Sequence, residues 1–135
     1  MKVIRFVSEM EKEIYLSGAK LINNDHHINN KTTSVGFCFA EISEKRDAEK
    51  WMRKLYLSTA CKWCIEFDTD NFSIPLNEST ARYSDDEDFK KTIEVREWCS
   101  TEYSLQTHPF TRIGKCPSFL GLCLGVNIVW KLNMY

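Results

Sequence analysis

The fold class is indicated first by residues 2–18, which read KVIRFVSEMEKEIYLSG. Apolar residues occupy both faces of residues 2–7, a pattern typical of a central strand in a sheet. Ser8 can cap a helix, and Glu11 three residues later completes the sequence pattern of a capping box. Gly18 then supplies a natural end for that helix. The segment therefore predicts a strand that runs directly into a short helix.

Further strands are predicted where apolar residues alternate or form short runs. The expected strands cover residues 19–22, 33–42, 62–68, 92–99, 109–116 and 126–132. In residues 33–42 the large residues Val35, Phe37 and Phe39 alternate with small ones, which is typical of a strand that another backbone or a ligand approaches closely. Residues 70–88 are polar and acidic and are expected to form a long connection.

A second helix is expected to start at Ser43 or Asp47. Its apolar stripe consists of Ala48, Trp51, Met52 and Leu55, which recur at helical spacing. Two main helices among several strands predict an α+β fold with small mixed or antiparallel sheets. The length of 135 residues, without a repeat or a linker, predicts a single domain over residues 1–135.

Composition narrows the classes of function. Hydrophobic residues make up 43% of the chain, so a packed core is expected. The 18 basic and 19 acidic residues give a net charge of -1, which argues against broad phosphate binding, so nucleic acid is not an expected partner, although it stays open as an acceptor. No apolar run approaches the roughly 18 residues that a membrane-spanning helix needs, so no membrane partner is expected.

The six cysteines are expected to be reduced. The N-terminal apolar run is too short for an export signal, which favours a cytoplasmic location. Cys61 and Cys64 have the spacing of a metal or redox pair, but a structural zinc site needs two such pairs. A strand that begins at residue 62 would also turn these two thiols to different faces. We therefore expect no metal, and a metal-binding or thiol-redox module is only the third functional hypothesis.

Two charged residues stand where the pattern favours apolar ones. Arg5 lies in the middle of an apolar strand, and Glu97 is in phase with Ile93, Val95 and Cys99. Buried charges are costly unless they are paired or line a solvated cleft. Three interpretations stay open: both residues serve one functional cleft, they form an ion pair with each other, or each reaches solvent at the end of its strand.

These residues, in this order, resemble the ADP-ribosyltransferase superfamily of the arginine–serine–glutamate type. Arg5 on the first strand matches the first motif, and the triplet at residues 32–34 that leads into a strand matches the second. Glu97 on a later strand matches the third, chosen over Glu94 and Glu102 by strand phase. The resemblance covers roughly residues 2–104 and implies a split β-sandwich.

The resemblance also implies a cofactor and a reaction. NAD would be the cofactor, held by residues of the first two motifs and of the strand that follows the second, namely Arg5, Thr33, Ser34, Gly36 and Phe39. Glu97 would be the catalytic residue, stabilising the oxocarbenium-like transition state as nicotinamide leaves. The acceptor of ADP-ribose is unknown, and Val95 stands where arginine-modifying members carry Gln or Glu.

A function from another class fits the same composition. A small, nearly neutral chain with 13% aromatic residues suits a non-enzymatic protein that binds a protein partner, such as an inhibitor or a phage-type counter-defence factor. Whether the chain is an enzyme therefore stays open. Whether Arg5 and Glu97 share one cleft is the feature that separates the two hypotheses.

Overall fold

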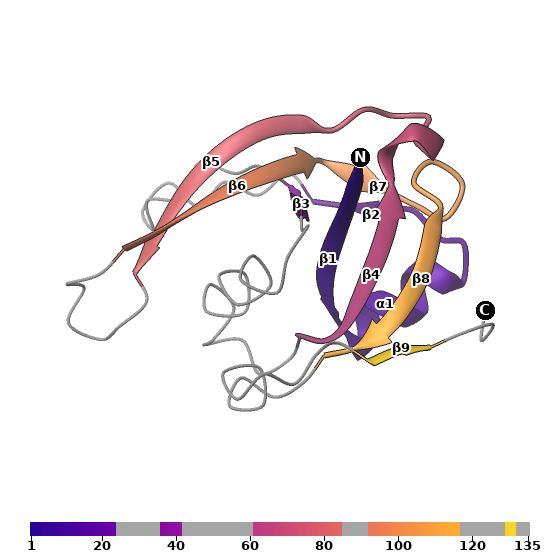
Figure 1. Ribbon diagram of the computed structural model, residues 1–135. Helices are drawn as coiled ribbons and strands as arrows, with labels where there is room; N and C mark the ends of the chain where they lie inside the picture. The colour runs from indigo at the N-terminus through magenta and orange to yellow at the C-terminus, as the bar shows by residue number, and fades with distance from the viewer. Residues whose placement is uncertain (24–35, 42–60, 85–91, 117–128, 132–135) are drawn as a thin grey trace.

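The computed structural model describes residues 1–23, 36–41, 61–84, 92–116 and 129–131. In this part of the chain the elements are β1 (Lys2–Ser8), α1 (Glu9–Leu16), β2 (Leu21–Ile22), β3 (Phe37–Glu41), β4 (Cys61–Asp68), β5 (Asn77–Ser84), β6 (Thr92–Ser100), β7 (Glu102–Tyr103), β8 (Phe110–Lys115) and β9 (Val129–Lys131), with a 3-10 turn at Thr69–Asn71. They form a seven-stranded sheet in the order β5-β6-β3-β1-β4-β8-β9 and a two-stranded sheet of β2 and β7 (Figure 1). Every described strand pair is antiparallel.

The first strand and helix form as the local sequence predicts. The Ser8 side chain accepts a hydrogen bond from the Glu11 backbone N–H and caps α1. The helix ends at Leu16, and Gly18 follows with a φ of 88°, a conformation that favours glycine. The Glu11 carboxylate does not complete the capping box, because it binds Arg5 and Tyr103 instead.

The strand register divides the central sheet into two faces. Directly opposed residues of antiparallel strands project to the same face, and successive residues to opposite faces. One face, here the helix face, comprises Val3, Arg5, Val7, Phe37, Phe39, Trp63, Ile65, Phe67, Trp98 and Ile113. The other, here the thiol face, comprises Ile4, Phe6, Cys38, Ala40, Cys64, Glu66, Glu97 and Cys99.

Helix α1 packs on the helix face and completes an aromatic core. The Tyr15 ring stacks on the Tyr103 ring with 5.3 Å between centroids, and it meets the Phe67 ring edge-on. The Tyr15 hydroxyl donates to the His108 carbonyl oxygen at 2.6 Å, which satisfies the polar end of this buried ring. The apolar pair Met10 and Ile14, one turn apart on the same helix, points away from the core, with Met10 73% exposed.

The ribbon of β5 and β6 extends beyond the rest of the sheet. Strand β6 pairs with β3 only from Trp98 to Ser100, whereas β5 and β6 pair from Thr92 to Cys99. Figure 1 shows the two strands sweeping away from the body formed by β1, β4 and β8. The base of this ribbon therefore lies where β6 leaves β3.

The α+β class is confirmed, and most of the expected strands are present. The expected connection over residues 70–88 is wrong, because eight of these residues form β5. Strand β4 lies between β1 and β8, and its residues 63–67 are buried on both faces. The expected second helix lies outside the described residues, and only α1 is described.

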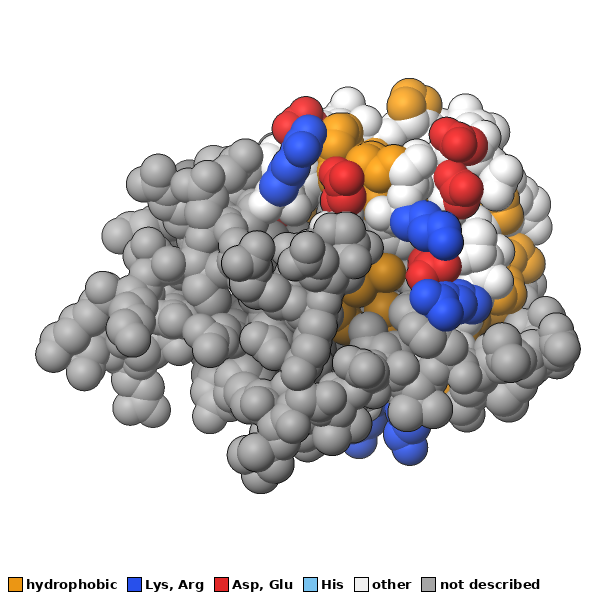
Figure 2. Space-filling model, in the orientation of Figure 1, with side chains coloured by type: hydrophobic (Ala, Val, Ile, Leu, Met, Phe, Trp, Pro, Cys, Tyr) orange, Lys and Arg blue, Asp and Glu red, His pale blue; other side chains and the backbone are white. Residues whose placement is uncertain are grey.

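The described surface carries charges of both signs, as the nearly equal numbers of basic and acidic residues predict. Figure 2 shows acidic and basic side chains interspersed over the described part of the visible face. Exposed ion pairs such as Arg96 with Glu78, 2.8 Å apart, contribute to this mixture. Among the described residues, no helix has both the length and the apolar character needed to cross a membrane.

Candidate functional site

Arg5 is held inside the fold by a specific set of partners. Its Nε and Nη2 atoms each donate to the Glu11 carboxylate at 2.8 Å, and Nη1 donates to the Cys38 carbonyl oxygen at 3.0 Å. The guanidinium also lies 4.9 Å from the Phe37 ring centroid and 5.7 Å from that of Tyr103. Burial alone would lower the pKa of Arg5, but the Glu11 carboxylate outweighs it and raises that pKa. The Arg5 guanidinium thus links β1 to α1 and β3.

Glu97 is completely buried on the thiol face. Its exposed fraction is 0%, and its carboxylate accepts a hydrogen bond from the Cys38 thiol at 3.6 Å. The strand phase that singled out this glutamate correctly predicted an inward-facing side chain. A carboxylate at such a position needs compensating donors or a cation, because an ionised group is expensive to remove from water.

Arg5 and Glu97 project from opposite faces of the same sheet. Arg5 lies opposite Ile65 on the helix face, whereas Glu97 lies beside Cys99 and Cys38 on the thiol face. Within the described residues, the two charges do not pair with each other. Glu97 does not reach solvent, and Arg5, whose side chain is 15% exposed, pairs with Glu11 from the middle of its strand. In the described residues they also do not line one cleft.

The other residues assigned to NAD have different positions. Phe39 is fully buried in the core between Phe67, Tyr103 and His108. Gly36 has a φ of 88°, and a side-chain carbon placed there would lie 2.2 Å from the Ser100 carbonyl oxygen. The close approach that this glycine permits is thus to the backbone of β6. Thr33 and Ser34 lie outside the described residues.

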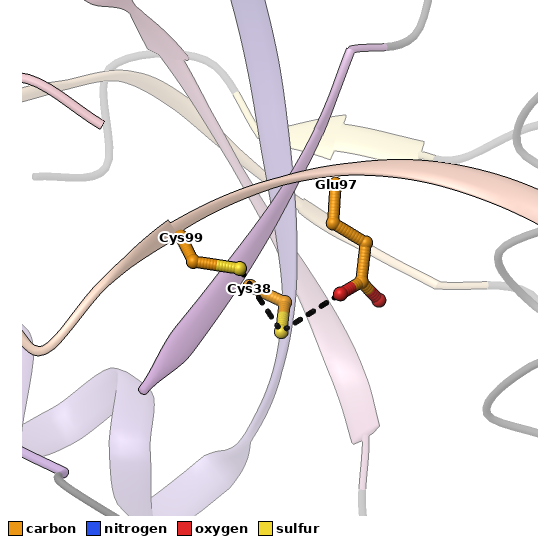
Figure 3. Close-up of side chains that lie close together, drawn as sticks. All are labelled: Cys38, Glu97 and Cys99. Atoms are coloured by element: carbon orange, nitrogen blue, oxygen red, sulfur yellow. Dashed lines mark hydrogen bonds between the residues drawn. The ribbon is translucent and has the colours of Figure 1, made fainter. Parts of the chain in front are cut away.

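Three metal-ligating side chains instead converge on the thiol face. Cys38 from β3 and Cys99 from β6 are directly opposed, and their Sγ atoms lie 3.9 Å apart. Glu97, two residues before Cys99 on β6, points to the same place, and the ligand atoms of all three residues lie within 4.8 Å of one another (Figure 3). We call Cys38, Glu97 and Cys99 the Cys–Glu–Cys cluster. It is the best-defined candidate site of the described residues.

The Cys61–Cys64 pair and His108 lie elsewhere in the fold. Cys64 is fully buried, and burial, with Cys116 and Glu66 nearby, raises the pKa of its thiol well above the usual value, which disfavours a reactive thiolate. The side chain of Cys61 is not among those described, so the proposed pair is untested. His108 is buried after a turn at residues 105–107, and its Nδ1 lies 2.7 Å from the Thr107 hydroxyl.

The Cys–Glu–Cys cluster was missed because its residues are far apart in the chain. Cys38 and Cys99 are separated by 61 positions, so no local spacing motif links them. One signal was available: Glu97 and Cys99 are two residues apart on a predicted strand and must share a face. Only the pairing of β3 with β6 adds the third ligand.

No protein-family model, curated protein or solved structure matches the chain.

Proposed function

We propose that this chain binds a protein partner that adds a strand to the outer edge of β5. One observation carries the proposal: β5 pairs with β6 along all eight of its residues, and within the described residues no strand pairs with its other edge. A strand edge presents backbone N–H and C=O groups at regular intervals, and an extended partner segment can use them for pairing.

The ribbon geometry supports this use of the edge. β5 and β6 extend beyond β3, so an added strand would meet the ribbon and not the crowded centre of the sheet. A two-stranded ribbon has little stability by itself, and a third strand would stabilise it. The first residues of β5 are polar, and Glu78 is tied to Arg96 on β6. Polar side chains along an edge strand reduce non-specific strand pairing, so that only a partner with complementary side chains is expected to bind there.

The ADP-ribosyltransferase hypothesis, including its split β-sandwich, stays a prediction. It assigns NAD binding to Arg5, Thr33, Ser34, Gly36 and Phe39, and catalysis to Glu97. For NAD to use the Arg5 guanidinium, it would have to displace the Glu11 carboxylate from two hydrogen bonds. It would also have to reach Glu97 on the opposite face of the sheet. The geometry of the described residues therefore favours partner binding.

Proline substitutions at two adjacent positions of β5 test the proposal. In an antiparallel strand, the backbone N–H groups of adjacent residues point alternately to the two edges, so one of Ser79 and Thr80 donates towards β6 and the other points outward. We expect one of Ser79→Pro and Thr80→Pro to lower the stability of the ribbon. The other should keep the melting temperature near that of the wild type and lose the partner.

Two measurements decide between the proposed functions. The partner is isolated by cross-linking and affinity capture with the wild type, and its affinity for both proline variants is then measured by calorimetry. Equal binding by the stable proline variant and the wild type would refute edge pairing. Titration with NAD, with nicotinamide release followed in parallel, tests the transferase hypothesis. NAD binding that depends on Arg5, with turnover that depends on Glu97, would support that hypothesis instead.

A further inference from the structure

We propose that the Cys–Glu–Cys cluster is a zinc site, with Cys38 Sγ, Cys99 Sγ and a Glu97 carboxylate oxygen as its protein ligands. Two thiolates and one carboxylate are a ligand set that Zn²⁺ accepts readily. All three residues come from regular strands, so their positions are fixed by the register of β3 and β6. The proposal does not depend on the partner proposed for β5.

Two of the three separations between the ligand atoms match those around a tetrahedral zinc ion. Bonds of about 2.3 Å to sulfur and about 2.1 Å to oxygen separate two sulfurs by about 3.8 Å and a sulfur from an oxygen by about 3.6 Å. The Sγ atoms of Cys38 and Cys99 lie 3.9 Å apart, and Cys38 Sγ lies 3.6 Å from Glu97 Oε2 (Figure 3). Cys99 Sγ and the Glu97 carboxylate lie within 4.8 Å of each other, and an ion would draw them to about 3.6 Å.

The ligand types favour zinc over other common cations. Ca²⁺ and Mg²⁺ prefer oxygen ligands, and two thiolates would bind them poorly. Cu⁺ prefers soft sulfur ligands, so a carboxylate in the set argues for Zn²⁺. Burial is also suitable, because Glu97 and Cys99 are buried whereas Cys38 is partly exposed and gives an ion a route to the site. A tetrahedral zinc ion needs a fourth ligand, which comes from a donor other than these three residues.

The location of the cluster suggests a structural role for the ion. Cys38 lies on β3 and Cys99 on β6, the two strands whose pairing joins the ribbon to the rest of the sheet. Glu97 is the first residue of β6 beyond the segment that pairs with β3. A zinc ion there would link β3 to the base of the ribbon. Both cysteines are free thiols, so each releases one proton to solvent when the ion binds, and Glu97 binds the ion as its carboxylate.

Zinc titration of the reduced full-length protein tests the proposal. We expect one Zn²⁺ per chain in the wild type, measured by elemental analysis after competition with a chromophoric chelator. Cys38→Ser and Cys99→Ser should each lose this ion, and Glu97→Gln should weaken its affinity by roughly tenfold or more. Cys116→Ser is the matched control, because Cys116 is also a partly exposed cysteine but lies outside the cluster, and it should retain the ion.

X-ray absorption at the zinc edge of the wild type gives a readout that does not require any variant to fold. We expect two sulfur ligands together with lighter atoms. Four sulfur ligands would overturn the proposal, and so would an ion that both Cys38→Ser and Cys99→Ser retain. Failure of the reduced wild type to bind zinc in competition with the chelator would also overturn it. Each of these results leaves the proline test of the β5 edge unaffected.

Discussion

At the scale of single residues, Gly36 shows most directly why this sequence needs a particular amino acid. Its φ of 88° lies in a region that other residues rarely adopt, and its Cα faces the backbone of β6. A side-chain carbon at this position would lie 2.2 Å from the Ser100 carbonyl oxygen and 2.8 Å from Thr101 Cα. Because both obstacles are backbone atoms, a rotamer change cannot relieve the clash.

We therefore expect Gly36→Ala to lower the free energy of unfolding by about 3 kcal/mol or more, from backbone strain and overpacking together. Gly18→Ala is the matched control, since Gly18 has the same φ of 88° but faces only the flexible Gln106 side chain. It should cost about 1 kcal/mol. Urea unfolding of both variants gives the comparison, and equal losses would show that the contact with β6 is unimportant.

At the scale of elements, the ion pair of Arg5 and Glu11 joins the first strand to the first helix. The Glu11 carboxylate also accepts a hydrogen bond from the Tyr103 hydroxyl at 2.6 Å. We expect Glu11→Gln to destabilise the fold by about 2 kcal/mol, because a partly buried guanidinium loses its counter-charge. Glu78→Gln, which removes only the exposed ion pair with Arg96, should change stability by less than about 0.5 kcal/mol. Thermal unfolding followed by circular dichroism measures both effects, and similar losses would contradict this role of Glu11.

The same scale shows how far the sequence could predict the structure. β1, α1 and the end of the helix follow from local patterns, since Ser8 caps the helix and Gly18 follows its last turn. β5 was missed because the segment around it is rich in polar and acidic residues, and pairing with β6 determines its structure. The partner of Arg5 was also missed, because a helix that packs back on its own strand brings Glu11 to it. Tertiary contacts, which no local pattern encodes, determine both the formation of β5 and the partner of Arg5.

At the scale of the whole molecule, the two faces of the sheet separate the two predicted site residues. Their position on strands could be predicted, and so could the inward direction of Glu97. That they lie on opposite faces follows only from the order and register of β1, β3 and β6 in the sheet. The same order brings Cys38 beside Cys99 and creates a metal-ligating cluster that the sequence did not reveal. The topology therefore shifts the best candidate site from an NAD cleft to the thiol face.

The stability of the whole molecule should depend on pH through His108. Burial beside Phe39 and Phe72 lowers the pKa of this imidazole below its usual value of 6.5, against the opposing effects of the Ile74 backbone and Glu102. The unfolded chain therefore binds a proton more readily than the folded one. The contribution of His108 is complete above pH 6.5 and is lost as the pH falls from 6.5 to the folded pKa. Each unit of pKa difference is worth about 1.4 kcal/mol.

We expect the free energy of unfolding of the wild type to fall between pH 6.5 and 5, and His108→Asn to reduce this slope. The asparagine does not titrate, and its Oδ1 can take the place of Nδ1 towards the Thr107 hydroxyl. Urea unfolding at several pH values measures the slope of the free energy of unfolding for the wild type and for the variant. An equal slope in His108→Asn and the wild type would mean that carboxylates, and not this buried histidine, set the acid sensitivity of the fold.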